Sequence, residues 1–378
     1  MRIALNAMQV RAAKSGVGQY IAGLLPALAE ACSADLLRVY CTAENVKNYR
    51  FPAANLEAVV WGLPESRRTM RLLNEYVRLH AELRRERFDL FHGLSNFLPP
   101  VKVCPYVVTI HDLSYFVHPH RCPWLRRHYW YAMTRRTVAV ADAIITDSEH
   151  SRRDIEHFFP QVRGQIRVVY PAAHPRFSPT EQDSDARDRE ALGIRRPYLL
   201  YVGTLEPGKN VERIIQAFDR LASRHPEHEL LLAGDRGWLF EGIFEAARRA
   251  TARDRIRFLG HVADEIVPAL MRGCDLFVFP SLYEGFGLPP LEAMACGAPV
   301  VTSTASSIPE VVGDAALQID PLSTDELASA MHRVLAEPSL RADLRARGPE
   351  RARQFSWQRA AAETRSVYLS VASRGQAS

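Results

Sequence analysis

The sequence lacks a membrane-spanning segment, a signal peptide, and the cysteine or histidine motifs of small domains that metal ions or disulfides stabilise. No hydrophobic run is long enough to span a membrane, and no C-x-x-C pair or histidine cluster has zinc-finger spacing. The N-terminus, MRIALNAMQV, has no cationic start, long apolar core or cleavage site of a signal peptide. We therefore expect a cytoplasmic protein rather than an exported sugar-binding module. The scattered cysteines are expected to be free thiols, mostly buried: Cys32, Cys41, Cys104, Cys122, Cys274 and Cys296.

Length and composition predict a globular protein of two domains. A chain of 378 residues exceeds what one hydrophobic core usually holds, and 47% hydrophobic with 24% charged residues is ordinary for a soluble protein. Short apolar runs of β type alternate with helical patterns, which favours parallel sheets covered by helices. The expected strands are 3–5, 36–40, 90–92, 106–110 and 143–146, followed by 198–202, 230–233, 256–259, 276–279 and 300–302.

This alternation predicts an α/β protein with two Rossmann-like, doubly wound units. The polar stretch 178–189 separates them, so we expect an N-terminal domain at residues 1–177 and a C-terminal domain at residues 178–356. Because such sheets bind ligands at the carboxyl ends of their strands, a cleft between the two domains is the expected site. Helices are expected at 211–223 and 357–372, among others.

The most informative segment is SLYEGFGLPPLEAMACG, residues 281–297, which follows an expected strand. A strand, a glycine-containing turn and a helix start form an anion site, because backbone N–H groups at the helix start face the ligand. Pro289 and Pro290 predict that the helix begins there. Glu284 on the loop and Glu292 in the first helical turn then flank the site, and carboxylates accept hydrogen bonds from hydroxyls. A sugar nucleotide has this layout, although each glutamate alone could be a solvated or dipole-stabilised residue.

A second turn carries a candidate phosphate ligand. The expected strand 198–202 leads into GTLEPGKN, residues 203–210, which opens a helix. Lys209 in this turn can pair with a diphosphate, and N–H groups of the turn can assist. An ordinary surface lysine is the alternative, but a cation is disfavoured near a helix start.

Segment 281–297 resembles the E-x7-E motif of retaining glycosyltransferases with the GT-B fold, those of the family 4 group. The resemblance implies two Rossmann-like domains facing a central cleft, with a C-terminal helix at about 357–374 that packs back on the first domain. It also implies transfer of a sugar from a nucleotide sugar to an acceptor with retained anomeric configuration, and no cofactor.

The resemblance assigns roles to individual residues. Glu284 would contact hydroxyls of the donor sugar, and Glu292 the ribose of the nucleotide. The residues that would face the sugar and phosphates besides Lys209 are Gly203, Thr204, Phe286, Gly287 and Leu288.

Relatives commonly carry a further cation in the turn that holds Lys209. This chain has Thr204 and Gly208 at the two positions concerned. Either Lys209 therefore acts alone, or a cation such as Arg213 or Arg236 takes the place of the missing one.

Two motifs in the first half fit the same resemblance. His111 and Asp112 follow the expected strand 106–110, and in the family pattern a histidine here faces the donor sugar. Asp112 would contact the acceptor or support the histidine. Gly16 and Gly18, in KSGVGQY, resemble the loop that approaches the donor phosphates or the acceptor. A hydrogen-bonded structural histidine and an ordinary turn are the alternatives.

The charge is uneven along the chain. Residues 1–175 hold 23 Lys and Arg against 15 Asp and Glu, a net of +8, which leaves −3 for the remainder of the total of +5. Positive residues gather at 67–87 and at 121–136, where arginines alternate with aromatic residues and no acidic residue occurs. Such a segment suits an anionic membrane surface, nucleic acid, or a solvated face over aromatic packing. Because family 4 members often act on lipid-linked acceptors, we favour the inner membrane surface and expect no nucleic acid partner.

We expect no metal requirement. Asp183 and Asp185 form a D-x-D sequence, the metal signature of the other main glycosyltransferase fold. They lie in the polar stretch between the domains and not at the end of an apolar strand, which predicts a solvated acidic loop.

The chemistry implied by the resemblance is a front-face displacement, with His111, Glu284 and Lys209 as the candidate catalytic residues. The motifs look most like those of bacterial surface-polysaccharide enzymes, so a hexosyltransferase that uses GDP-mannose is the first hypothesis, with a glycan or polyprenyl-linked acceptor. A donor with UDP or dTDP, or a GT-B sugar-nucleotide 2-epimerase, remains an alternative. A nicotinamide dehydrogenase is disfavoured because the complete G-x-G-x-x-G layout is missing.

Overall fold

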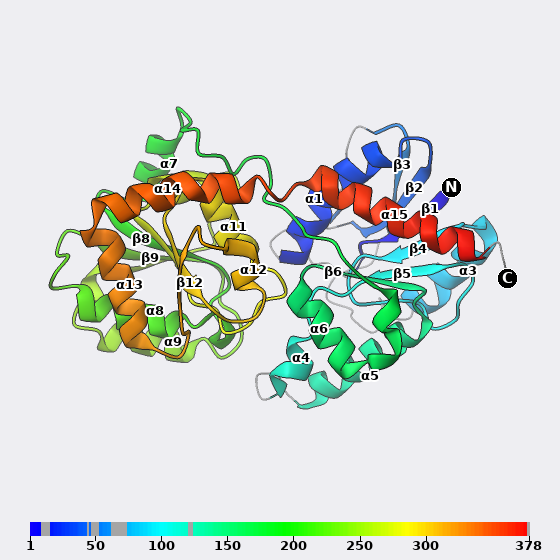
Figure 1. The fold of residues 1–378 in the computed structure, drawn as a ribbon, viewed down its shortest axis with the longest axis horizontal. Coiled ribbons are helices and arrows are strands. Elements are labelled where there is room, and N and C mark those ends of the chain that lie inside the picture. Colours follow the sequence, from blue (N-terminus) through cyan, green and yellow to red (C-terminus); the bar gives the residue numbers. More distant parts are fainter. Residues whose placement is uncertain (9–15, 44, 47–52, 62–73, 120–123, 376–378) are drawn as a thin grey trace. The chain divides into compact units, whose positions relative to one another are not determined.

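The computed structural model describes residues 1–8, 16–43, 45–46, 53–61, 74–119 and 124–375 (Figure 1). The chain divides into two compact units. Unit 1 comprises Met1–Ala172 and Ser356–Ser378, and unit 2 comprises Ala173–Phe355.

Unit 1 is built on a parallel sheet with the strand order β3-β2-β1-β4-β5-β6-β7. The strands are β1 (Arg2–Asn6), β2 (Leu36–Thr42), β3 (Leu56–Trp61), β4 (Leu90–Gly93), β5 (Tyr106–Thr109), β6 (Ala143–Thr146) and β7 (Ile166–Val168). All residues of β4, β5 and β6 are buried. Strands covered on both faces need apolar side chains on both faces, which explains their unbroken hydrophobic runs.

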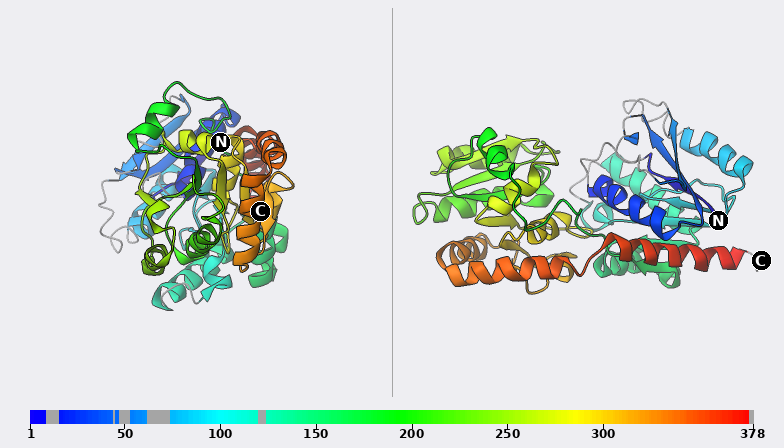
Figure 2. Two further views of the ribbon diagram at one scale, coloured as in Figure 1. Left: turned by 90° about the vertical axis from the view of Figure 1, so that its left-hand side faces the viewer. Right: turned by 90° about the horizontal axis from the view of Figure 1, so that it is seen from above.

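Helices cover this sheet, and one of them comes from the end of the chain. They are α1 (Gly16–Ala31), η2 (Asn74–Leu79), α3 (His80–Glu86), α4 (Ser114–Val117), α5 (Trp124–Val140), α6 (Glu149–Phe158), η4 (Pro160–Gln165) and α15 (Trp357–Gly375). The last helix, red in Figures 1 and 2, runs beside α1. The ring of Trp357 meets Tyr20 edge-on at 5.9 Å between centroids. The hydroxyl of Tyr368 lies 2.6 Å from Nδ1 of the buried His92, so α15 is anchored at two points.

Unit 2 contains a second parallel sheet, with the order β10-β9-β8-β11-β12-β13. The strands are β8 (Tyr198–Val202), β9 (Glu229–Ala233), β10 (Ile256–Gly260), β11 (Leu276–Phe279), β12 (Val300–Ser303) and β13 (Leu317–Ile319). The order reverses between β8 and β11. This reversal is the topological switch point of a doubly wound sheet.

The helices of unit 2 form two packed groups. They are α7 (Asp185–Ala191), η5 (Pro207–Lys209), α8 (Val211–Leu221), α9 (Glu241–Arg249), η6 (Arg253–Arg255), α10 (Val267–Gly273), α11 (Leu288–Ala295), α12 (Ile308–Val312), α13 (Thr324–Ala336) and α14 (Pro338–Ala352). Helix α8 packs against α9 and α13, whereas α11 packs against α10 and α14. Helices α8 and α9 follow strands on one side of the switch point and α11 follows a strand on the other, whereas α13 follows β13 yet packs on α8 and also contacts α14.

Three strands were not expected from the sequence, and each lies at the edge of a sheet. They are β3 and β7 at the two edges in unit 1, and β13 at one edge in unit 2. Strand β3 is mostly half-buried or exposed, and β7 and β13 have three residues each. A short or half-exposed edge strand lacks the continuous apolar run that identified the central strands.

The cysteines within the described residues carry free thiols, as predicted. Cys32, Cys41, Cys274 and Cys296 are buried, and Cys104 is partly buried. Burial raises the pKa of the Cys274 thiol to about 12, so it stays protonated at neutral pH.

Candidate functional site

The switch point of unit 2 brings two of the predicted residues together. Lys209 follows β8, and Glu284 follows the neighbouring β11. Nζ of Lys209 donates hydrogen bonds to both carboxylate oxygens of Glu284, at 2.7 and 2.9 Å. The exposed fractions of the two side chains are 22% and 12%, so water screens this pair less than a surface pair. Parallel α/β sheets bind ligands at this position.

The two loops that carry this pair are fastened to each other and to the loop after β12. The amide of Leu282 donates to the carbonyl of Gly208 at 2.9 Å. The amide of Glu284 donates to Oγ of Ser306 at 2.8 Å. The hydroxyl of Ser307 bonds the carbonyl of Glu284 at 2.9 Å, and it also lies 2.7 Å from the carbonyl of Phe286. Contacts among the loops that follow β8, β11 and β12 therefore fix the backbone that carries the Glu284 carboxylate.

Phe286 itself is a core residue. Its side chain is 5% exposed and meets the ring of Phe355 edge-on at 5.6 Å between centroids. Its carbonyl is occupied by Ser307. The ring therefore holds the loop to the core, and a contact between the Phe286 backbone and the donor stays a prediction.

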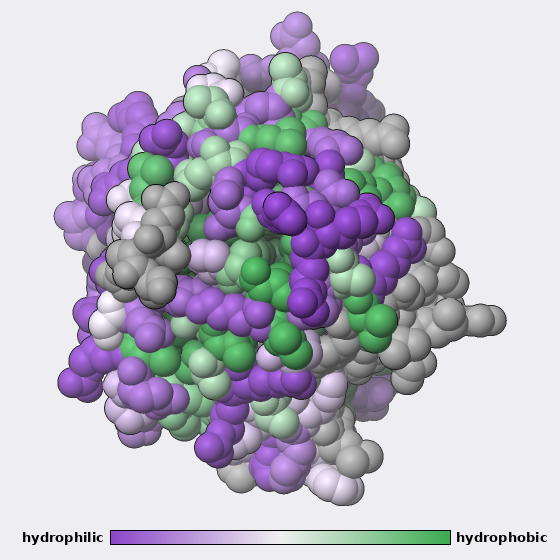
Figure 3. All heavy atoms as spheres, turned by 90° about the vertical axis from the view of Figure 1, so that its right-hand side faces the viewer, coloured by the Kyte–Doolittle hydropathy of each residue, from purple (hydrophilic) through white to green (hydrophobic). Residues whose placement is uncertain are grey.

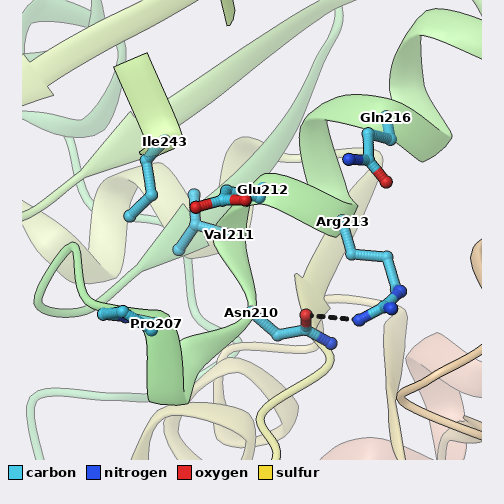
Figure 4. A pocket seen from close by; sticks show the side chains of 7 residues that line it. All are labelled: Pro207, Asn210, Val211, Glu212, Arg213, Gln216 and Ile243. Carbon is cyan, nitrogen blue, oxygen red and sulfur yellow. Dashed lines mark hydrogen bonds between the residues drawn. The ribbon is translucent and has the colours of Figure 1, made fainter. Parts of the chain in front are cut away.

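Asn210 is a site residue that the sequence analysis did not single out. It has a positive φ of 61° and precedes α8. Its Nδ2 donates to the carbonyls of Pro280 and Pro321 at 3.0 and 2.7 Å, and its Oδ1 accepts from Arg213 at 2.8 Å (Figure 4). Arg213 also contacts Oγ1 of Thr324, so this candidate second cation already has two partners. Asn210 thus fixes the turn that carries the candidate phosphate ligand.

A small cavity lies beside this turn, between α8 and α9. It is lined by Pro207, Asn210, Val211, Glu212, Arg213, Gln216 and Ile243 (Figure 4). Its volume is about 160 Å³. Pockets for small ligands usually measure about 300–1,000 Å³, so we do not assign a nucleotide to it.

Helix α11 begins one residue before the two prolines. Gly287 precedes it with φ 116°, where a Cβ would lie 2.7 Å from the Ile308 side chain, so this position requires glycine. Leu288 is the first helical residue. Because Pro289 and Pro290 have no N–H, Leu288 supplies the backbone donor at the helix start.

Glu292 does not lie in the first turn of α11, so that prediction was wrong. The earlier helix start makes Glu292 the fifth helical residue, and the first turn has no acidic residue. Burial raises the pKa of Glu292 to about 8; Arg176 opposes the shift and Asp264 adds to it. At pH 7 the neutral carboxyl therefore predominates, and it can both donate and accept a hydrogen bond.

Gly203 and Thr204 follow β8 as predicted. Gly203 has φ 156° and its amide donates to the carbonyl of Ala233 at 2.9 Å, while Thr204 is exposed. Arg236, the other candidate for a second cation, places its guanidinium 4.9 Å from the centroid of the Phe244 ring.

His111, at the end of β5 in unit 1, is engaged at both ring nitrogens. Nδ1 lies 2.6 Å from Oδ2 of Asp147, and Nε2 lies 3.0 Å from the carbonyl of Leu94. Both partners are acceptors, so both ring nitrogens carry protons. Burial lowers the pKa of His111, but Asp147 and the Leu94 carbonyl outweigh it, and the net shift is upward. Oδ1 of Asp112 accepts from the amide of Ser114 at 2.7 Å at the start of α4.

Gly16 and Gly18 lie at the start of α1. Gly16 is exposed with open space where a Cβ would be, and Gly18 is buried. The preceding residues of the KSGVGQY motif, Lys14 and Ser15, lie outside the described residues.

The prediction of a solvated acidic D-x-D loop was wrong for one of its two residues. Asp183 is exposed, but Asp185 begins α7 and is 1% exposed. Nε and Nη2 of Arg272 each donate to Asp185 at 2.6 Å, which lowers the pKa of that carboxyl. Asp185 therefore fastens α7 to α10 and is not presented to a metal ion.

Helix α5 contains residues 124–136 of the basic and aromatic 121–136 segment, and residues 121–123 lie outside the described residues. Trp130 stacks on Tyr115 at 5.7 Å, and Tyr131 packs on Phe116 at 4.7 Å between centroids. Trp124 is 66% exposed. Aromatic packing thus accounts for part of the pattern, and a membrane contact stays a prediction. Among the described residues, no helix combines the length and apolar character needed to cross a membrane.

The other basic segment, 67–87, is described from residue 74 onward. Arg84 and Arg85 of α3 are exposed, and Arg78 places its guanidinium 4.8 Å from the centroid of the Trp61 ring. Figure 3 shows the side of unit 1 near α3, where hydrophilic side chains separate small hydrophobic areas. The described part of this segment presents exposed arginines over the buried Leu79 and Leu83, and a membrane contact stays a prediction.

Comparisons with known proteins agree with the fold. Residues 184–351 match the family described as glycosyl transferases group 1, and residues 14–177 match the family described as glycosyltransferase family 4. The chain is 32% identical to O-antigen chain mannosyltransferase B of Escherichia coli, over 97% of this chain and 99% of that protein. The chain belongs to this glycosyltransferase family.

Solved structures agree with the GT-B assignment of this glycosyltransferase. Sucrose-phosphate synthase from Thermosynechococcus elongatus superposes with a TM-score of 0.78 at 21% identity, covering 99% of this chain and 100% of that one. WaaG, a glycosyltransferase involved in lipopolysaccharide biosynthesis, gives a TM-score of 0.72 at 20% identity, with 98% of each chain covered. At these identities the likeness concerns the fold alone.

Proposed function

We propose that this glycosyltransferase moves a hexose from a nucleotide sugar to a glycan or polyprenyl-linked glycan during synthesis of a cell-surface polysaccharide. The observation that carries the proposal is the meeting of Lys209 and Glu284 at the switch point of unit 2. Mannose is our first hypothesis for the sugar, supported by the name of the Escherichia coli relative. GDP-mannose is the proposed donor, with UDP- and dTDP-sugars as alternatives.

We propose that Lys209 and Glu284 exchange partners when the donor binds. The diphosphate takes the ammonium group of Lys209, and the carboxylate of Glu284 accepts hydrogen bonds from hydroxyls of the sugar. Each charge then keeps a partner, so donor binding leaves neither charge unpaired in this half-buried place. Lys209 also counters the charge that develops on the leaving diphosphate.

The other predicted contacts remain part of the proposal. In unit 2, Glu292 contacts the ribose hydroxyls, and the Leu288 amide at the start of α11 contacts a phosphate oxygen. In unit 1, His111 and Asp112 serve the transferred ring and the acceptor. Asp147 and the Leu94 carbonyl hold the His111 ring in place, and His111 supports the transferred sugar through its backbone.

The proposed reaction retains the anomeric configuration. The bond between the anomeric carbon and the diphosphate oxygen breaks, and the acceptor hydroxyl forms its bond on the same face. The proton of that hydroxyl passes to an oxygen of the departing diphosphate, which leaves as the nucleoside diphosphate. The protein contributes positioning and charge stabilisation and requires no metal ion. The enzyme would act on the cytoplasmic side of the membrane, in contact with its anionic surface.

Proton NMR of the product tests the proposal. The purified chain is incubated with GDP-mannose and a mannose-terminated glycan in excess EDTA, and we expect an α-linked product like the donor. A β-linked product would refute retention, and activity restored only by Mn²⁺ would refute metal independence. Failure to transfer from any donor in a panel of GDP-, UDP- and dTDP-sugars would refute the function.

A sugar-nucleotide 2-epimerase is the competing function within the same fold. Incubation of each donor without acceptor separates the two, because an epimerase changes the configuration at C2 and a transferase leaves it intact. Epimerised donor in the NMR spectrum would decide against the transferase.

A further inference from the structure

A cluster of three histidines lies at the opposite edge of the unit 2 sheet from Lys209. His225 and His228 belong to the sequence H-P-E-H, residues 225–228, which directly precedes β9, and His332 comes from α13. This is the edge where the parallel strands begin. The five residues of β9 separate it from the carboxyl edge by about 16 Å, at about 3.3 Å per residue. The cluster is therefore distinct from the proposed donor site.

Three possible metal ligands converge in the H-P-E-H segment. Imidazole nitrogens of His225 and His228 and a carboxylate oxygen of Glu227 all lie within 4.8 Å of one another. From Oε1 of Glu227, Nδ1 of His228 lies at 2.7 Å and Nδ1 of His225 at 3.8 Å. Ligand atoms in a tetrahedral zinc site stand about 3.3 Å apart, since each bond is about 2.0–2.1 Å. Shifts of about half an ångström would bring these two separations to that value, and the separation between the two imidazole nitrogens is at most 4.8 Å.

The second nitrogen of each histidine has the kind of partner that orients a metal ligand. Nε2 of His225 lies 2.9 Å from Nδ1 of His332, and Nε2 of His228 lies 3.3 Å from Oδ2 of Asp275. In the metal-bound state a proton on each Nε2 would leave both Nδ1 lone pairs for the ion. Histidines that bind metals commonly donate their other N–H to an acceptor. Nε2 of His225 is at hydrogen-bond distance from His332, whereas Oδ2 of Asp275 is near Nε2 of His228 without forming a hydrogen bond of acceptable geometry.

The hydrogen-bonding groups of the buried His228 ring are unsatisfied. It is 6% exposed, and within the described residues neither ring nitrogen has a hydrogen-bond partner of acceptable geometry. The nearby carboxylate oxygens lie out of line with the N–H directions. A buried imidazole without partners is costly, and a cation between its Nδ1 and Glu227 would remove that cost.

Two arginines hold the backbone of the segment in place. Nη1 of Arg255 donates to the carbonyls of His225 and His228, at 2.9 and 3.0 Å. Arg196 donates to the other two carbonyls of residues 225–228. All four carbonyls are engaged, so the ligands are oriented before any ion binds.

We propose that His225, Glu227 and His228 bind one divalent transition metal ion, Zn²⁺ in first place, with water as the fourth ligand. Two imidazoles and one carboxylate match Zn²⁺ and not Mg²⁺ or Ca²⁺, which prefer oxygen ligands. Through His332 and Asp275 the bound ion ties the connection before β9 to α13 and to the start of β11. It stabilises unit 2 and takes no part in sugar transfer.

Calorimetric titration of Zn²⁺ into the tag-free, EDTA-stripped full chain tests the proposal, after the EDTA has been removed and without any sugar nucleotide. We expect one Zn²⁺ per chain with a micromolar or tighter Kd and no heat with Mg²⁺. The Tm should rise by several degrees when free Zn²⁺ exceeds its Kd 100-fold. Binding of Co²⁺ should give the visible absorption bands of a four- or five-coordinate site.

Two matched variants locate the site. Glu227→Gln changes a side chain that is 51% exposed, so the fold should persist, and we expect Zn²⁺ affinity to fall at least tenfold. Glu245→Gln on α9, 47% exposed, is the control and should bind like the wild type. No saturable Zn²⁺ binding, or equal affinities of the two variants, would overturn the proposal. Because no sugar transfer is measured, these outcomes are independent of the proposed function.

Discussion

Glu284→Gln separates the structural from the chemical role of this carboxylate. The amide keeps the shape of the side chain but loses the charge that pairs with Lys209 at 2.7 and 2.9 Å. The exposed fractions of 22% and 12% place the pair between surface and buried, so we expect a loss of about 1 kcal/mol of unfolding free energy. Charge-assisted hydrogen bonds to sugar hydroxyls contribute about 1.5–3 kcal/mol each, so kcat should fall about 100-fold or more.

Glu284→Gln should affect the affinity for the nucleoside diphosphate differently from its effect on kcat. Glu284→Gln frees Lys209 from its carboxylate partner, so the Kd of GDP should stay the same or decrease. Steady-state kinetics with GDP-mannose and calorimetry with GDP measure the two effects, and Glu245→Gln serves as the control. Unchanged turnover, or GDP binding weakened as much as turnover, would refute the partner exchange.

Two further predictions concern stability. Gly23→Ala places a Cβ against the Trp357 ring and should lower the unfolding free energy by about 1–3 kcal/mol. Gly164→Ala is the control, because its Cβ meets open space and should leave the unfolding free energy unchanged. Equal Tm values for the two variants would contradict the packing of α15 on α1. The pKa of Glu292 is raised from 4.5 to about 8, so the native chain binds more protons than the unfolded chain between those values. The unfolding free energy should therefore fall as pH rises across that window, by at most about 1.4 kcal/mol per pH unit. Glu292→Gln should flatten this pH dependence in calorimetry. An unchanged pH dependence in the variant would disprove the raised pKa.

The sequence predicted the central strands well and the edge strands poorly. Strands β4, β5 and β6 are buried on both faces, so their residue types reveal them. Strand β3 alternates irregularly between half-buried and exposed positions, and β13 has three residues. Such strands are defined by pairing with a neighbour far away in the chain, and a local pattern does not record that pairing.

Some features of the candidate site could be expected from the sequence, and others could not. Strand ends and helix starts placed Lys209 and Glu284 at one edge, because parallel strands share their carboxyl edge. Their direct ion pair and the role of Asn210 were not predicted, since Asn210 works through carbonyls 70 and 111 residues away. The H-P-E-H segment does not have zinc-finger spacing, and its partner His332 lies 107 residues beyond His225. Contacts at such separations depend on the tertiary fold.

Calorimetric titration of GDP and GMP into the wild type and Lys209→Gln tests the central claim most directly. If Lys209 holds the leaving diphosphate at the switch point of unit 2, the substitution should weaken GDP at least tenfold, because a charge-assisted contact contributes about 1.5–3 kcal/mol. GMP, which lacks the second phosphate, should bind both proteins alike. Equal GDP affinities for the two proteins would contradict the claim.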